Sequence, residues 1–126
     1  MLIAGMVVAA LAALFHVVFF LFESVLWTRP AVFGRFGIGS QAEADTIRPM
    51  AYNQGFYNLF LAIGAIVGLI LYGVGMHAAG LALILFTMAS MVAAAVVLTT
   101  TGRGYLRPAL VQGILPLIGF VLILFP

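Results

Sequence analysis

The sequence predicts an all-α membrane protein that crosses the bilayer four times as a single bundle of helices. Of its 126 residues, 66% are hydrophobic and only 6% are charged, which is too few charges to cover the surface of a soluble domain. The apolar residues fall into long stretches, each close to the ~20 residues that one helical crossing requires. The absence of Cys excludes disulfides and thiol chemistry, and the chain has no phosphate-binding loop or basic run.

The first helix is expected over residues 2–27. Trp27, Arg29 and Pro30 mark its end, because they supply an interface aromatic, an anchoring charge and a helix breaker. Its apolar stretch is too long for a secretory signal, so we interpret it as a retained transmembrane helix.

Residues 28–48 form the longest loop. Ser40 and Glu43 have the spacing of a capping box, which predicts a short helix. That helix either runs into the next one with a break at Pro49, or stops and restarts with Pro49 in its first turn. Four apolar side chains of this loop are expected to dip into the headgroup region. They are Val32, Phe33, Phe36 and Ile38.

The remaining helices are expected over residues 50–72, 78–100 and 108–126. The short link between the first two of these predicts antiparallel neighbours. In the last helix Pro116 leaves the carbonyl of Gln112 without its helical partner, which predicts a kink.

The arginines predict the orientation of the bundle. All five basic residues are Arg, and they lie in or beside loops 28–48 and 101–107. With four crossings both loops lie on the same side, and the positive-inside rule makes that side the cytoplasm. Both termini are then outside. A model with three crossings would split the arginines between the two sides.

A polar stripe runs along the first predicted helix and joins His16 to Glu23, seven residues apart. Small residues continue it toward the N-terminus, whereas the opposite face, which includes Phe22, is bulky and apolar. Helix faces made of small and polar residues pack inward in membrane bundles. Charged side chains within a bilayer are found mainly where they are paired, hydrated or functional. We therefore expect both side chains to face the bundle interior.

Further polar side chains are expected at the same, cytoplasmic depth as Glu23. With it they predict a polar pocket that opens to the cytoplasm. The expected pocket residues are His16 at the floor, Glu23, Asn53, Gln54, Asn58 and Gln112, with Tyr57, Arg103 and Arg107 at the rim.

Each signal also has a plainer interpretation. Glu23 can reach the interface or pair with an arginine of the loop, and His16 can be a hydrogen-bonded core residue. The amides can simply join helices, at roughly 0.6 kcal/mol per bond. Tyr57 can be an aromatic residue at the membrane interface. Arg103 and Arg107 can simply fix the orientation of the helices in the membrane. His77 and His16 lie at different depths, so neither a metal site nor a cofactor is expected.

The block Asn53-Gln54-Gly55-Phe56-Tyr57-Asn58, together with His16, Glu23 and Trp27, resembles the family of small bacterial four-helix membrane proteins catalogued as domain of unknown function 1304. The resemblance covers nearly the whole chain. It implies four crossings and a location in the bacterial inner membrane, and it brings no substrate, reaction or catalytic residue.

Three functions remain open. The first is binding of a small amphipathic or lipid-like ligand. A buried imidazole near a carboxylate can also pass a proton, so whether the protein is an enzyme stays open. The second is proton-coupled export of small molecules, for which a homodimer is a natural form. The third is a structural or assembly subunit of a larger membrane complex. The lipid bilayer is an expected partner, and nucleic acid is not.

Overall fold

The computed structural model describes residues 1–126 and contains helices and connections only. Its elements in chain order are α1 (Leu2–Phe20), the π-helix η1 (Leu21–Val25), α2 (Pro30–Phe33), the 3-10 helix η2 (Gly34–Phe36), α3 (Gln41–Gly73), α4 (His77–Thr99), the 3-10 helix η3 (Arg103–Tyr105) and α5 (Leu106–Leu124). Four stretches are long and apolar enough to cross a membrane: Leu2–Val25, Gln41–Gly73, His77–Thr99 and Arg103–Leu124. The all-α, four-helix membrane bundle is therefore confirmed.

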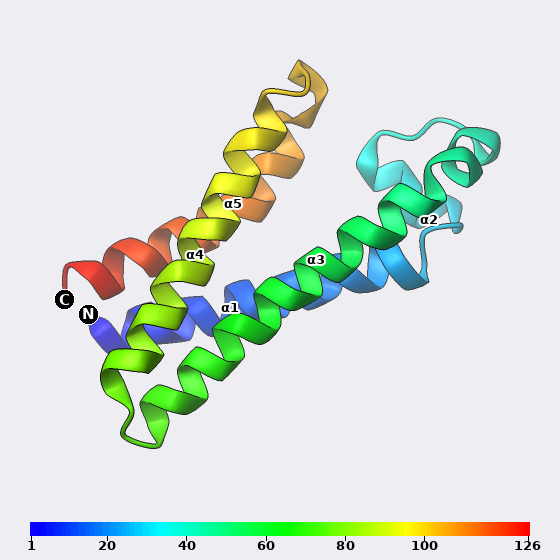
Figure 1. Cartoon of the computed structure of the whole chain (residues 1–126). Helices are drawn as coiled ribbons and strands as arrows, with labels where there is room; N and C mark the ends of the chain where they lie inside the picture. Colours follow the sequence, from blue (N-terminus) through cyan, green and yellow to red (C-terminus); the bar gives the residue numbers. More distant parts are fainter.

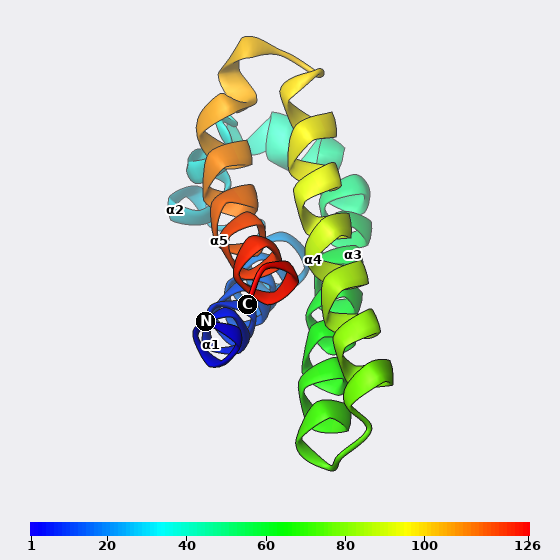
Figure 2. The same ribbon diagram turned by 90° about the vertical axis from the view of Figure 1, so that its left-hand side faces the viewer.

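The four long helices form a ring of neighbours. α1 packs against α3 and α5, and α4 packs against the same two helices. Figures 1 and 2 show the connections around α2 and between α4 and α5 at one end of the bundle, with both termini and the α3–α4 turn toward the other. All five arginines thus lie toward one end of the molecule.

At the end of the bundle opposite the arginines, glycines allow the helices to pack closely. A Cβ on Gly80 of α4 would lie 2.6 Å from the Tyr72 nitrogen and 2.7 Å from the Gly68 oxygen of α3. A Cβ on Gly5 of α1 would lie 2.6 Å from Cγ1 of Ile123 in α5. Small residues therefore let backbones approach each other here, as expected in membrane bundles.

The stripe on α1 faces inward as predicted. Gly5, Ala9, Ala12, His16 and Glu23 are all buried. The helix itself ends earlier than residue 27, because the chain changes to π geometry at Leu21 and leaves the helix after Val25.

α3 begins at Gln41 instead of residue 50, so the expected loop 28–48 is partly helical. The Ser40 Oγ accepts a hydrogen bond from the Glu43 nitrogen at 3.1 Å, which caps the first turn. Pro49 then lies inside one continuous helix of 33 residues. The capping signal thus starts a helix that continues without interruption into the membrane span.

The rest of this connection folds back onto α3. Trp27 is buried, and its Nε1 donates to the Ala44 oxygen at 3.0 Å. Phe33 is buried against Trp27 and Ala44, and Phe36 and Ile38 pack against them, so these side chains form a small core of their own.

The last two helices differ from expectation only at their ends. α4 spans His77–Thr99, and α5 begins at Leu106 with Pro108 in its first turn, where a missing N–H is tolerated. α5 ends at Leu124 instead of 126. Figure 1 shows it changing direction between its orange and red parts. The helix contains Pro116, in line with the predicted kink.

Candidate functional site

A cavity of about 850 Å³ lies between the two helix pairs at the arginine-bearing end. Figure 1 shows α4 and α5 diverging from α1 and α3 toward this end. The kink of α5 contributes, because its C-terminal half packs on α1 while its N-terminal half stays with α4. The cavity walls come from η1 and the end of α1, η2, α3, α4, and η3 with α5. They comprise Phe19, Phe22, Glu23, Gly34, Arg35, Phe36, Gln54, Asn58, Ala94, Val97, Leu98, Thr101, Tyr105, Arg107, Pro108, Val111 and Gln112.

Three polar side chains of this wall are joined by hydrogen bonds. Nδ2 of Asn58 donates to Oε1 of Glu23 at 2.8 Å, and Nε2 of Gln112 donates to Oδ1 of Asn58 at 3.4 Å. Glu23 is 8% exposed and Asn58 is 2% exposed. The chain of bonds therefore connects η1, α3 and α5 in the bundle interior.

The π geometry of η1 determines where Glu23 lies. The Leu26 nitrogen donates to the Leu21 oxygen at 2.8 Å, five residues back. Next to Glu23, the Ser24 Oγ donates to the Tyr52 oxygen of α3 at 2.7 Å. Gly55 makes this approach possible, because a Cβ there would overlap the Ser24 hydroxyl. η1 and α3 are thus held closely together beside the carboxylate.

Two cationic side chains line the same cavity from different elements. Arg35 belongs to η2 and Arg107 to the first turn of α5. The guanidinium carbon of Arg35 lies 5.5 Å from the centroid of the Phe22 ring, a cation–π arrangement. Glu23 forms no salt bridge with either arginine, so the plainer interpretation in which a loop arginine pairs with the acid does not describe this structure.

His16 lies behind the cavity wall and does not line the cavity. It is 0% exposed, and its Nδ1 donates to the Ala12 oxygen at 2.8 Å, which leaves Nε2 buried without a hydrogen-bond partner. Its ring packs edge-on against Phe19, with the centroids 5.3 Å apart, and Phe19 does line the cavity. The imidazole therefore contacts a wall residue without lining the cavity itself.

The other expected residues divide between the cavity and the surface. All five are exposed, but only Gln54 and Arg107 line the cavity, whereas Asn53, Tyr57 and Arg103 do not. Neighbouring positions on a helix point about 100° apart, so α3 presents only the Gln54 and Asn58 face to the cavity.

Sequence reasoning missed Arg35, Phe22 and Tyr105 as wall residues. Helical spacing predicts Phe22 on the outer face, but in the structure it lies in the π segment η1 and lines the cavity. Nothing in the local sequence showed that the connection after Trp27 would fold back to place Arg35 there.

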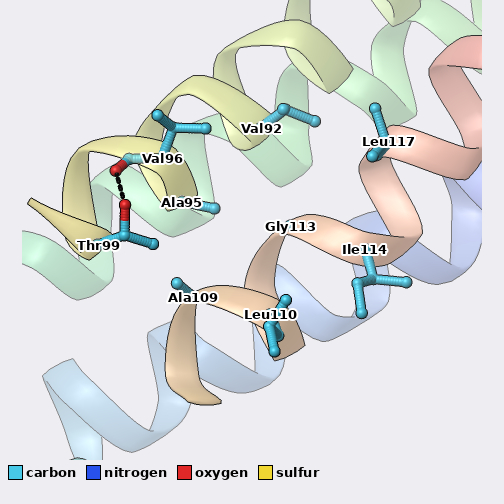
Figure 3. A pocket seen from close by; sticks show the side chains of 9 residues that line it. All are labelled: Val92, Ala95, Val96, Thr99, Ala109, Leu110, Gly113, Ile114 and Leu117. Carbon is cyan, nitrogen blue, oxygen red and sulfur yellow. Dashed lines mark hydrogen bonds between the residues drawn. The ribbon is translucent and has the colours of Figure 1, made fainter. Parts of the chain in front are cut away.

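A second hollow lies between α4 and α5 and holds about 160 Å³ (Figure 3). Figure 3 shows apolar side chains around it, with Thr99 as its one hydroxyl, and that hydroxyl donates to the Val96 oxygen of its own helix at 2.6 Å. This groove has no polar group free to recognise a ligand. Nowhere in the structure do three His, Asp or Glu side chains meet in a way that would hold a metal. The polar cavity is therefore the candidate site.

The comparisons with known proteins give a family and no function. No curated protein and no solved structure matches the chain. A family model described as a protein of unknown function, DUF1304, matches residues 10–124, which is nearly the whole chain. The chain therefore belongs to the DUF1304 family of proteins of unknown function.

Proposed function

We propose that this membrane protein binds a small amphipathic ligand in the cavity between its two helix pairs. The observation that supports the proposal best is the composition of one wall. Glu23, Asn58 and Gln112 form a hydrogen-bonded row in which the first two are buried. Phenylalanine and aliphatic side chains line much of the remainder, together with a few polar side chains and two arginines. A cavity of about 850 Å³ falls within the ~300–1,000 Å³ usual for small-molecule sites, which combine apolar walls with a few oriented polar groups.

The same hydrogen bonds also join helices, so they alone do not distinguish a site from interhelical contacts. Gln54 makes the distinction, because it lines the cavity and takes no part in the Glu23–Asn58–Gln112 row. Its amide is available to a ligand. We place the cavity mouth on the cytoplasmic side of the bacterial inner membrane, because all five arginines lie at that end.

The test is native mass spectrometry of protein purified in mild detergent. Wild-type protein is expected to retain an organic molecule, and Gln54→Leu is expected to reduce retention. Asn53→Leu is the matched control, since Asn53 is the adjacent amide and is exposed as Gln54 is, but does not line the cavity. Absence of any bound molecule, or equal loss in both variants, would contradict ligand binding at this site.

Proton-coupled export is the second candidate. It is favoured by one observation: Glu23 is a buried acid without a salt bridge, beside a cavity that opens at one end. Such an acid can take up and release a proton as its surroundings change. Flux of a small cation driven by a pH gradient in proteoliposomes should disappear in Glu23→Gln. Unchanged flux would remove Glu23 from the mechanism.

A further inference from the structure

We infer that the ligand is an anionic amphiphile whose phosphate or carboxylate headgroup binds between Arg35 and Arg107, an inference that rests on the proposed ligand binding. The two guanidinium groups line one cavity but come from connections far apart in sequence, η2 and the start of α5. A headgroup between them would be bound from two sides of the mouth.

The charges of the cavity favour an anion over a cation. Its wall contains two arginines and one acid, and the acid already accepts a hydrogen bond from Asn58. Neither arginine is neutralised by a salt bridge to Glu23. Guanidinium groups match phosphate and carboxylate oxygens with paired N–H donors, which makes arginine the preferred side chain for such headgroups.

Arg35 is positioned by the Phe22 ring. Its guanidinium carbon lies 5.5 Å from the ring centroid, so the ring stabilises one face of the cation and leaves its N–H edge free to bind an oxyanion. Phe22 belongs to η1, the segment that also contains Glu23. The segment η1 therefore positions both Glu23 and Phe22, the ring that packs against Arg35.

The remainder of the cavity fits an apolar tail. Phe19, Val97, Leu98 and Val111 line it, and they come from three different helices. The amides of Gln54 and Gln112 can hydrogen-bond a polar linker between headgroup and tail. A free inorganic anion would leave this apolar volume unused, whereas an amphiphile fills it.

Arginines at a membrane interface can also attract anionic lipids without any site. The chain offers matched controls for this effect. Arg48 and Arg103 are exposed, as Arg35 and Arg107 are, and lie at the same end of the molecule, but they do not line the cavity. A specific binding site requires that substitution of Arg35 or Arg107 weakens ligand binding more than substitution of Arg48 or Arg103 does.

The experiment compares two probes that share one tail with a third that has none. Purified protein is titrated with dodecyl phosphate, with the zwitterion dodecylphosphocholine and with inorganic phosphate, and bound species are counted by native mass spectrometry. Trp27 gives a second readout, because it is the single tryptophan and its ring lies 5.2 Å from that of Phe36, a wall residue.

Dodecyl phosphate is expected to bind about tenfold more tightly than dodecylphosphocholine, and Arg35→Gln and Arg107→Gln should each remove about that factor, the effect of one charge-assisted hydrogen bond. Arg48→Gln and Arg103→Gln should bind as wild type does. Phosphatidic acid and phosphatidylcholine with identical chains then test a membrane lipid as the natural source, against a soluble amphiphile.

Three results would overturn the inference. Equal binding of the two dodecyl probes, with Gln54→Leu weakening both, would retain the ligand site but exclude anion selectivity. Equal losses in all four arginine variants would mean surface attraction only. Binding of inorganic phosphate as tightly as dodecyl phosphate would exclude a role for the tail. If no probe binds and no molecule is retained on purification, ligand binding itself fails.

Discussion

Asn58 donates a 2.8 Å hydrogen bond to the carboxylate of Glu23, a residue 35 positions earlier in the chain. A carboxylate in a membrane bundle is more often expected to meet an arginine or water. Here an amide from a neighbouring helix fulfils part of that role. Since Asn58 also accepts a bond from Gln112, one side chain holds three segments of the bundle together around the cavity.

Removing the Asn58 amide should show how much the burial of Glu23 depends on this hydrogen bond. Asn58→Leu is expected to lower stability in detergent by about 1–3 kcal/mol, because Glu23 would remain buried without its donor. The double variant Glu23→Leu with Asn58→Leu should recover part of that loss, since both polar partners are then absent. Unfolding midpoints measure both effects, and strictly additive losses would contradict the coupling.

The contact between α3 and α4 should not accept a methyl group. Gly80→Ala is expected to destabilise the bundle by about 1–3 kcal/mol, because the added Cβ would meet the Gly68 oxygen and Tyr72 nitrogen, which are backbone atoms that cannot rotate away. Gly73→Ala is the control. It lies at the end of α3 with nothing within 4 Å of its Cβ, so a change below about 0.5 kcal/mol is expected. Similar thermal shifts for both variants would argue against this close contact.

His16 gives the opposite expectation for stability. Its buried Nε2 has no partner, and its Nδ1 bonds a carbonyl that already belongs to the helix. His16→Leu should therefore leave the melting temperature unchanged or raise it, since an unsatisfied buried acceptor is removed. The same variant should be assayed for ligand retention. A marked loss of stability would mean that the imidazole has a partner in the membrane-embedded protein.

The orientation can be measured directly because the chain contains no cysteine. Gly104→Cys places a thiol in the α4–α5 connection, with open space around its Cβ. Met76→Cys places one in the exposed α3–α4 turn. In intact cells a membrane-impermeant maleimide should label the thiol at 76 and not the one at 104. The reverse pattern would invert the proposed topology.

Composition and the distribution of arginines were sufficient to predict four crossings, because the length of an apolar helix and the charge of its flanks are local properties. The inward stripe of α1 was also predictable from helical spacing. Two features were not. The connection after Trp27 folds through contacts with Ala44 that no local pattern announces, and the π segment changes the register that a helical wheel assumes.

For the candidate site, this explains which residues sequence analysis found. Gln54, Asn58 and Gln112 lie on regular helical faces, and Glu23 follows the inward stripe of α1 closely enough for spacing to group it with them. Arg35 and Phe22 depend on the irregular parts of the chain and were not predicted. Asn53 and Tyr57 belong to the same sequence block as Gln54 but point away, because a block shared in sequence is not a face shared on a helix.

The π turn makes the cavity wall depend on the number of residues in η1. Each residue added to or removed from an α-helix rotates everything beyond it by about 100°. Deleting one residue within Leu21–Val25 would allow an ordinary α turn, yet it would change the facing of Glu23 or Phe22 relative to α3. Within η1, length therefore matters as much as residue identity, and a variant of this protein that lacks one residue there should be regarded as having lost the cavity wall even if every wall residue remains.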